Sequence, residues 1–101
     1  MYERFTDRAR KVMQLANQSM EIIEAMAETG NPNSVSDAGV GALCARSAVM
    51  GAFLNVKINA AGLTDKEFAS KIIREGAAIE EEAKKSETKI LSIVNSKMQT
   101  I

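Results

Sequence analysis

The side chains best suited to chemistry lie close together in the first half of the chain. Asp37 offers a carboxylate that could accept or donate a proton, and Asn33 and Ser36 offer hydrogen-bonding groups nearby. A structural role competes with this interpretation, because Ser34, Ser36 and Asp37 are typical of a helix N-terminus, where they satisfy open backbone amides and the helix dipole. We favour the structural role.

Arg46 and Cys44 stand in a stretch of small, apolar residues. The Arg46 cation could meet a carboxylate of a ligand or pair with Asp37 or another acid, and we favour the structural ion pair. The chain has no histidine and one cysteine, which excludes a His/Cys zinc site, a histidine base and an internal disulfide. Without a histidine to lower its pKa, Cys44 is expected to be a small buried apolar residue. We predict no metal and no resident cofactor.

Charge and hydropathy exclude several classes of partner. Thirteen basic residues balance thirteen acidic ones, so no basic footprint for nucleic acid is present. The first residues are charged where a signal peptide needs an apolar segment, and the apolar run 38–54 is short and interrupted by Arg46. We therefore expect a soluble, cytoplasmic protein without a membrane partner.

Spacing of apolar residues predicts three long helices, at about 6–29, 35–61 and 65–99. The first carries apolar or small residues three and four apart and stops at Gly30 with Pro32 beyond it. The apolar stripe of this helix comprises Phe5, Ala9, Val12, Met13, Ala16, Met20, Ile23 and Ala27.

The second and third helices differ in character. The second is rich in alanine and glycine, which allow close approach of another backbone, and this favours a central helix packed on several sides. The third begins with a predicted capping box of Thr64 and Glu67, and Leu63 and Phe68 stand at the positions of a hydrophobic staple. The small residues of its stripe, including Gly76 and Ala83, suit bulky partners.

These elements predict one all-α domain over residues 1–101, in which the three helices form a bundle. Helices of this length would be about 35 to 50 Å long, whereas a compact domain of this size has a radius of gyration of about 13 Å. An elongated bundle hides its apolar stripe poorly alone, so we expect a homo-oligomer that completes the bundle, with a dimer favoured.

The stretch GNPNSVSDAGVGAL at residues 30–43 resembles the hallmark of the formiminotransferase-cyclodeaminase family, which includes methenyltetrahydrofolate cyclohydrolases. The resemblance continues through GAFLNVKIN at 51–59 and covers about residues 19–98. It implies an all-helical oligomer that acts on a one-carbon unit of tetrahydrofolate. It also implies a folate pocket near Asn33, Ser36 and Asp37, with Asp37 as the catalytic group and Arg46 as a further ligand-binding group.

The printed sequence lacks the glycine-rich loop that precedes this region in the family. Residues 2–18 instead resemble the first helix of the N-terminal repeat domain of Clp-type ATPase chaperones. The change near Gln18 and Ser19 favours an engineered chimera of residues 1–18 and 19–101 that folds and self-associates without native activity. The alternatives are a tetrahydrofolate cyclodeaminase or cyclohydrolase whose pocket is rebuilt by an oligomer, a truncated natural protein, and a Clp-type adaptor.

Overall fold

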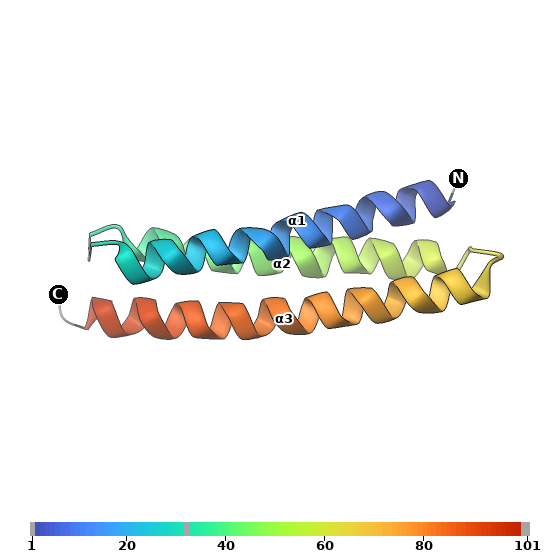
Figure 1. The fold of residues 1–101 in the computed structure, drawn as a ribbon. Helices are drawn as coiled ribbons and strands as arrows, with labels where there is room; N and C mark the ends of the chain where they lie inside the picture. The colour runs from blue at the N-terminus through green and yellow to red at the C-terminus, as the bar shows by residue number, and fades with distance from the viewer. Residues whose placement is uncertain (1, 32, 100–101) are drawn as a thin grey trace.

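The computed structural model describes residues 2–31 and 33–99, and for residues 2 and 3 the backbone alone. Within these residues three helices lie side by side, each antiparallel to the one before it in the chain, in a rod with extents of 55 × 18 × 16 Å (Figure 1). They are α1 (Tyr2–Thr29), α2 (Val35–Ala60) and α3 (Lys66–Met98). The prediction of an all-α fold is confirmed, and each predicted helix is present: two of the six ends coincide with the prediction and the other four differ by one to four residues.

Helix α1 runs without a break through the joint that we predicted near Gln18 and Ser19. Met13, Met20 and Ala27 are buried, at the seven-residue spacing of a helix that packs along one seam. Phe5 and Val12, which we placed on the same face, are exposed. The two neighbouring helices cover only part of the circumference of α1, so the apolar residues divide between a buried and an open side.

The end of α1 depends on close backbone packing and on a distant lysine. The Gly30 amide donates to the carbonyl of Met26 at 2.8 Å, and a Cβ at Gly30 would lie 2.5 Å from that oxygen. The Lys97 ammonium of α3 donates to the carbonyls of Ala27 and Glu28. Because α1 has no basic residue in its last turn, Lys97 supplies the cation that its C-terminus favours. Pro32, the second predicted stop residue, lies outside the described residues.

Helix α2 contacts both other helices and buries a side chain on nearly every turn. Its third side, with Val40, Leu54 and Ile58, is exposed. The prediction of a central helix is thus confirmed for two sides only. By length and composition α2 could also cross a membrane, but a single helix that passes this test is weak evidence, since core helices of soluble proteins pass it too.

The start of α3 differs from our prediction by one residue. Asp65, and not Thr64, is the N-cap, and its Oδ1 accepts a hydrogen bond from the Phe68 amide at 3.1 Å. A carboxylate is a good cap and also favours the positive end of the helix dipole. Leu63 is buried beside this start, which anchors the turn between α2 and α3.

Candidate functional site

The loop between α1 and α2 is organised by Asn31. Its Oδ1 accepts hydrogen bonds from the backbone amides of Asn33 at 2.9 Å and Ser34 at 3.2 Å. Ser34 is the N-cap of α2 but makes no side-chain hydrogen bond to the helix, so the capping role that we favoured for it is wrong. An asparagine that bonds the backbone two residues further on is a common turn-former. Asn31 was therefore a signal in the sequence for this turn, whereas our prediction used Gly30 and Pro32 for the end of the first helix and Ser34 for the start of the second.

Asn33, Ser36 and Asp37 lie together at this end of the rod, and all three are exposed. Asp37 stands in the first turn of α2, where the helix dipole favours the ionised carboxylate. Among the described residues no ion pair or side-chain hydrogen bond engages this carboxylate. We call these three residues the polar cluster; it offers an acid, an amide and a hydroxyl, open to water.

Arg46 lies apart from the polar cluster. It is about 14 Å further along α2 than Asp37 and faces α3, where its Nη1 contacts Glu87 Oε1 at 3.0 Å and Oε2 at 3.4 Å. Glu87 is 8% exposed. The expected structural ion pair is therefore confirmed, with Glu87 as the acid. The ligand-binding role of Arg46 stays a prediction, and it competes with this ion pair.

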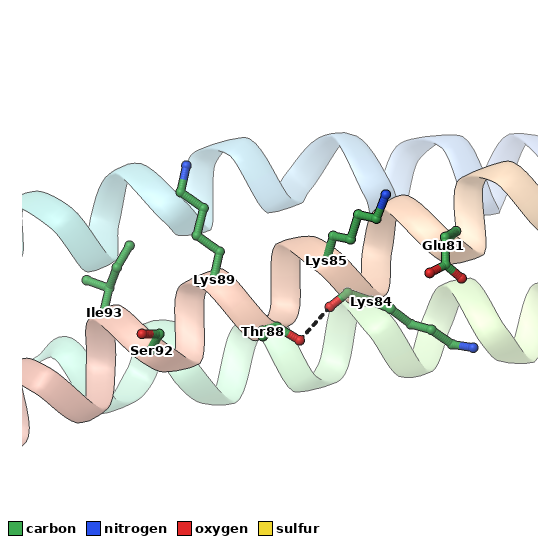
Figure 2. Close-up of a pocket in the computed structure, with 7 residues that line it drawn as sticks. All are labelled: Glu81, Lys84, Lys85, Thr88, Lys89, Ser92 and Ile93. Atoms are coloured by element: carbon green, nitrogen blue, oxygen red, sulfur yellow. Dashed lines mark hydrogen bonds between the residues drawn. The ribbon is translucent and has the colours of Figure 1, made fainter.

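A shallow groove runs along α3, with a volume of about 580 Å³ (Figure 2). Lys85 and Lys89 extend from it toward α1, whereas Lys84 points to the other side. Lys89 Nζ lies 2.5 Å from Glu24 Oε1, and the hydrogen bond and charge of Glu24 raise the pKa of Lys89. The lysines thus diverge, and the polar cluster contributes no residue to this groove.

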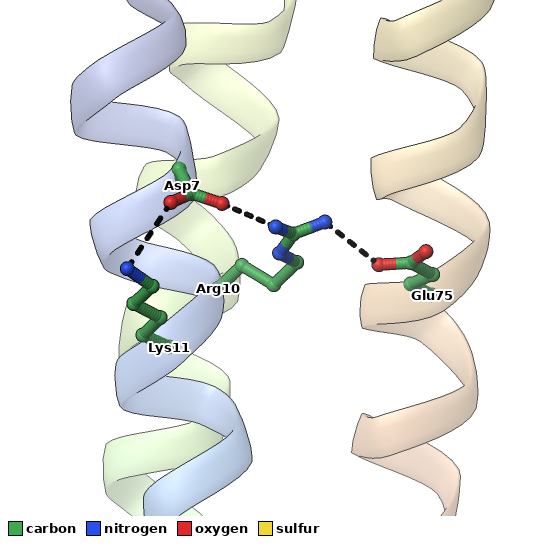
Figure 3. Close-up of polar contacts among 4 residues, drawn as sticks. All are labelled: Asp7, Arg10, Lys11 and Glu75. Atoms are coloured by element: carbon green, nitrogen blue, oxygen red, sulfur yellow. Dashed lines mark hydrogen bonds and ion pairs between the residues drawn. The ribbon is translucent and has the colours of Figure 1, made fainter.

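A second arginine joins α1 to α3 (Figure 3). Arg10 binds Asp7 on its own helix, and its Nη1 lies 3.3 Å from Glu75 Oε2. The Nε atoms of Arg10 and Arg46 are both buried, and neither has a hydrogen-bond partner within the described part of the chain. The sequence motifs did not single out Glu75 or Glu87. For Glu87 a signal existed, because it falls three or four residues from the buried Ala83 and Ile90.

Cys44 is exposed, so the prediction of a buried thiol is wrong. Its exposure means that the neighbouring helices leave this position of α2 open to water. The apolar residues that surround Cys44 in the sequence include exposed ones, so they do not bury the thiol.

The described residues define a class of protein: an elongated all-helical one, with a polar cluster that none of its described grooves encloses. Comparison with known proteins identifies the class more closely. The model of the formiminotransferase-cyclodeaminase family matches residues 2–78, and the chain belongs to this family.

One curated relative is the methenyltetrahydrofolate cyclohydrolase of Methylorubrum extorquens. It is 36% identical to this chain over 93 residues, which cover 92% of the chain and 45% of the relative. The chain therefore spans about half the length of that relative.

These comparisons correct our main functional interpretation. The family match begins at residue 2 and runs across Gln18 and Ser19 into α3, so the segment that we assigned to a Clp-type helix belongs to the same family as the rest. The prediction of an engineered chimera without native activity is wrong. A short run of helical residues resembled another family because amphipathic helices share spacing and composition whatever their origin.

Proposed function

We propose that this chain acts as a tetrahydrofolate-dependent cyclohydrolase, which hydrolyses the methenyl group of methenyltetrahydrofolate. The observation that carries this proposal is the 36% identity, over 92% of the chain, to a protein named methenyltetrahydrofolate cyclohydrolase. It also fits the exposed carboxylate of Asp37, which stands beside an amide and a hydroxyl within the residues that the family model matches.

Hydrolysis of the methenyl group requires a base for the attacking water and a negative charge near the cationic methenyl carbon. The methenyl carbon bridges two nitrogens and carries part of a positive charge, so water can add to it once a proton is removed. One carbon–nitrogen bond then breaks, and the leaving nitrogen takes up a proton, which gives the formyl product. In this scheme Asp37 accepts the proton of the attacking water and attracts the cationic carbon.

Asn33 and Ser36 have the second role in this scheme. Their amide and hydroxyl groups would hydrogen-bond the polar edge of the folate and hold the methenyl carbon near Asp37. We leave Arg46 out of the binding set, since Glu87 already holds its guanidinium.

A cyclodeaminase is the second candidate, favoured by the description of the family. It would act on a formimino group and release ammonia, and Asp37 would again move the proton. The cyclodeaminase would form the methenyl group that the cyclohydrolase consumes, so release of ammonium from the formimino substrate separates the two activities. The name of the relative favours the cyclohydrolase.

The polar cluster is open to water in one chain, whereas efficient chemistry of this kind needs a site that excludes it. We propose that the 101 residues form one domain that acts as a homodimer in the cytoplasm, with the tetrahydrofolate derivative as its substrate. No metal or further cofactor and no nucleic acid or membrane partner enters this proposal.

The test is the loss of methenyltetrahydrofolate absorbance when purified protein is added. Asp37→Asn should lower the rate by at least about a hundredfold, the range typical of a general base. Glu67→Gln is the matched control, because Glu67 is an exposed acid in the first turn of α3 and lies far from the cluster. A wild-type rate no higher than buffer, or equal rates for both variants, would contradict the proposal.

A further inference from the structure

One long side of the rod is apolar and uncovered. It is built by α1 and α2 and faces away from α3, since α3 contacts the opposite sides of both helices, through Arg10 and Asn17 on α1 and through Gly39, Arg46 and Phe53 on α2. We call it the outer face. Its exposed large apolar residues are Phe5, Val12, Leu15, Ile22 and Met26 on α1 and Val40 and Ile58 on α2.

The exposure of this face is large for a protein surface. Leu15 and Ile22 are each 67% exposed, and Ile58 is 72% exposed. Contiguous apolar patches of this kind mark interaction sites, and a helix that is apolar on all sides is normally buried on all sides. The outer face therefore requires a covering partner.

Two opposite charges stand at the two ends of this face. Arg8 shares the heptad line of Leu15 and Ile22, and Asp37 shares that of Cys44 and Ile58. Both charged side chains are exposed, and among the described residues neither has an ion-pair partner. Helix α1 alone is also positive toward the Arg8 end and negative toward the Asp37 end. Its basic residues lie in its first half, and Glu21, Glu24 and Glu28 lie in its second half.

The distance between these charges follows from helix geometry. Ile23 lies beside Gly41, which fixes the level of α1 against α2. At 1.5 Å per residue, Arg8 lies about 22 Å from that level in one direction and Asp37 about 6 Å in the other, so about 28 Å separates them along the rod. An antiparallel second copy brings the basic end of one chain to the acidic end of the other. A parallel copy would bring like charges together.

The middle of the outer face suits such a pairing. Midway between Asp37 and the level of Arg8, α2 carries Ser47 and Ala48, and about one turn further on it carries Gly51, where a Cβ would meet nothing within 4 Å. Small residues there let two α2 helices approach closely. Between the two charges, a face about 28 Å long and 18 Å wide offers on the order of 500 Å² per copy, so parts of the 55 Å rod beyond the charges must also take part to reach the roughly 800 Å² per partner of a standard interface.

We propose that a second copy of this chain packs antiparallel on the outer face, and that its Arg8 completes the polar cluster of the first copy beside Asp37. By two-fold symmetry Arg8 of the first copy completes the second cluster. Arg8 is then a positioning residue: its guanidinium holds and orients the Asp37 carboxylate from across the interface. The pairing itself stands on the outer face and its charges, and its meaning for catalysis rests on the proposed function.

Charge reversal tests the pairing without any activity measurement. Sedimentation velocity should show a dimer for the wild type, and Arg8→Glu and Asp37→Arg should each weaken dimerisation by about tenfold or more. Arg8→Glu combined with Asp37→Arg should restore it, and Arg8→Lys should retain it. Arg74→Glu is the control, because Arg74 is exposed on α3, away from the outer face. A monomeric wild type, or a double variant no tighter than the single ones, would overturn the proposal.

Crosslinking tests the antiparallel register. In a Cys44→Ser background, Arg8→Cys protein mixed with Asp37→Cys protein should form a disulfide-linked dimer under mild oxidation, and each protein alone should form far less. Crosslinking of Arg8→Cys protein to itself would instead show a parallel pairing and overturn the proposal. If the cysteine variants form no crosslinks and the wild-type protein is monomeric but active, the pairing is rejected and the proposed function stands. If the variants crosslink as expected and the wild-type protein shows no activity, the pairing stands and the proposed function is rejected.

Discussion

Gly76 of α3 lies directly against the ring of Phe53 of α2. A Cβ at Gly76 would be 2.4 Å from Cε1 and 2.6 Å from Cδ1 of that ring, far inside van der Waals contact. The expectation that the small residues of the third helix accept bulky partners is confirmed at this position. The close approach of α2 and α3 therefore depends on the missing side chain.

Gly76→Ala should destabilise the fold by about 1 to 3 kcal/mol, because the new methyl group forces the Phe53 ring out of its place. Urea unfolding followed by circular dichroism measures this change. Gly41→Ala is the matched control, since its Cβ would meet Ile23 at an ordinary 3.5 Å and alanine is the better helix former. Equal stability of the two variants would show that α2 and α3 are packed more loosely.

Arg46→Met should cost about 2 kcal/mol of stability, because it leaves the nearly buried Glu87 carboxylate without its charged partner. Adding Glu87→Leu should recover much of this loss, since both charges are then gone. The KM for methenyltetrahydrofolate should stay within about twofold of the wild type for the double variant, because neither group binds substrate in the proposed scheme. A large rise in KM would instead support the ligand-binding role of Arg46 that was predicted from the sequence.

Lys97→Met should destabilise α1 locally, by about 1 kcal/mol, through loss of the cation at its C-terminal carbonyls. Faster hydrogen exchange in the last turn of α1 is the direct measurement. Lys71→Met, at an exposed position of α3, should leave that exchange unchanged. Unchanged hydrogen exchange in the Lys97 variant would mean that the lysine does not stabilise the last turn of α1.

Substitutions at two alanines of α2 distinguish an effect on dimerisation from an effect on the folding of one chain. Ala48 is exposed on the outer face, so Ala48→Leu should weaken the dimer and leave the fold of each chain intact. Ala45 is buried within the chain, so Ala45→Leu should lower the free energy of unfolding itself, by about 1 to 3 kcal/mol. Molar mass and urea unfolding, measured on both variants, check this division. Equal effects of both substitutions on mass and stability would contradict it.

The helices could be predicted from the sequence because their signals are local. Apolar residues three and four apart marked α1, and the polar start of α3 was recognisable although its cap is Asp65 and not Thr64. The exposed positions of Phe5 and Cys44 could not be predicted, because they depend on which sides of a helix its two neighbours leave open.

The candidate site was predictable only in part. Asn33, Ser36 and Asp37 are close in sequence, and the structure keeps them together at the start of α2. The partner of Arg46 depends on the register between α2 and α3, which no local pattern encodes. A similar limit explains the misassigned residues 2–18, where helical spacing alone does not identify a family.

The central claim is that one functional site is built from Asp37 of one chain and Arg8 of another, and complementation tests it most directly. Arg8→Met and Asp37→Asn protein, each of low activity alone, are mixed and allowed to exchange subunits before cyclohydrolase activity is measured. We predict recovery of about a quarter of wild-type activity, because half of the dimers are then mixed and each of these has one intact site. A mixture no more active than its separate components, with mixed dimers present by mass, would contradict the claim.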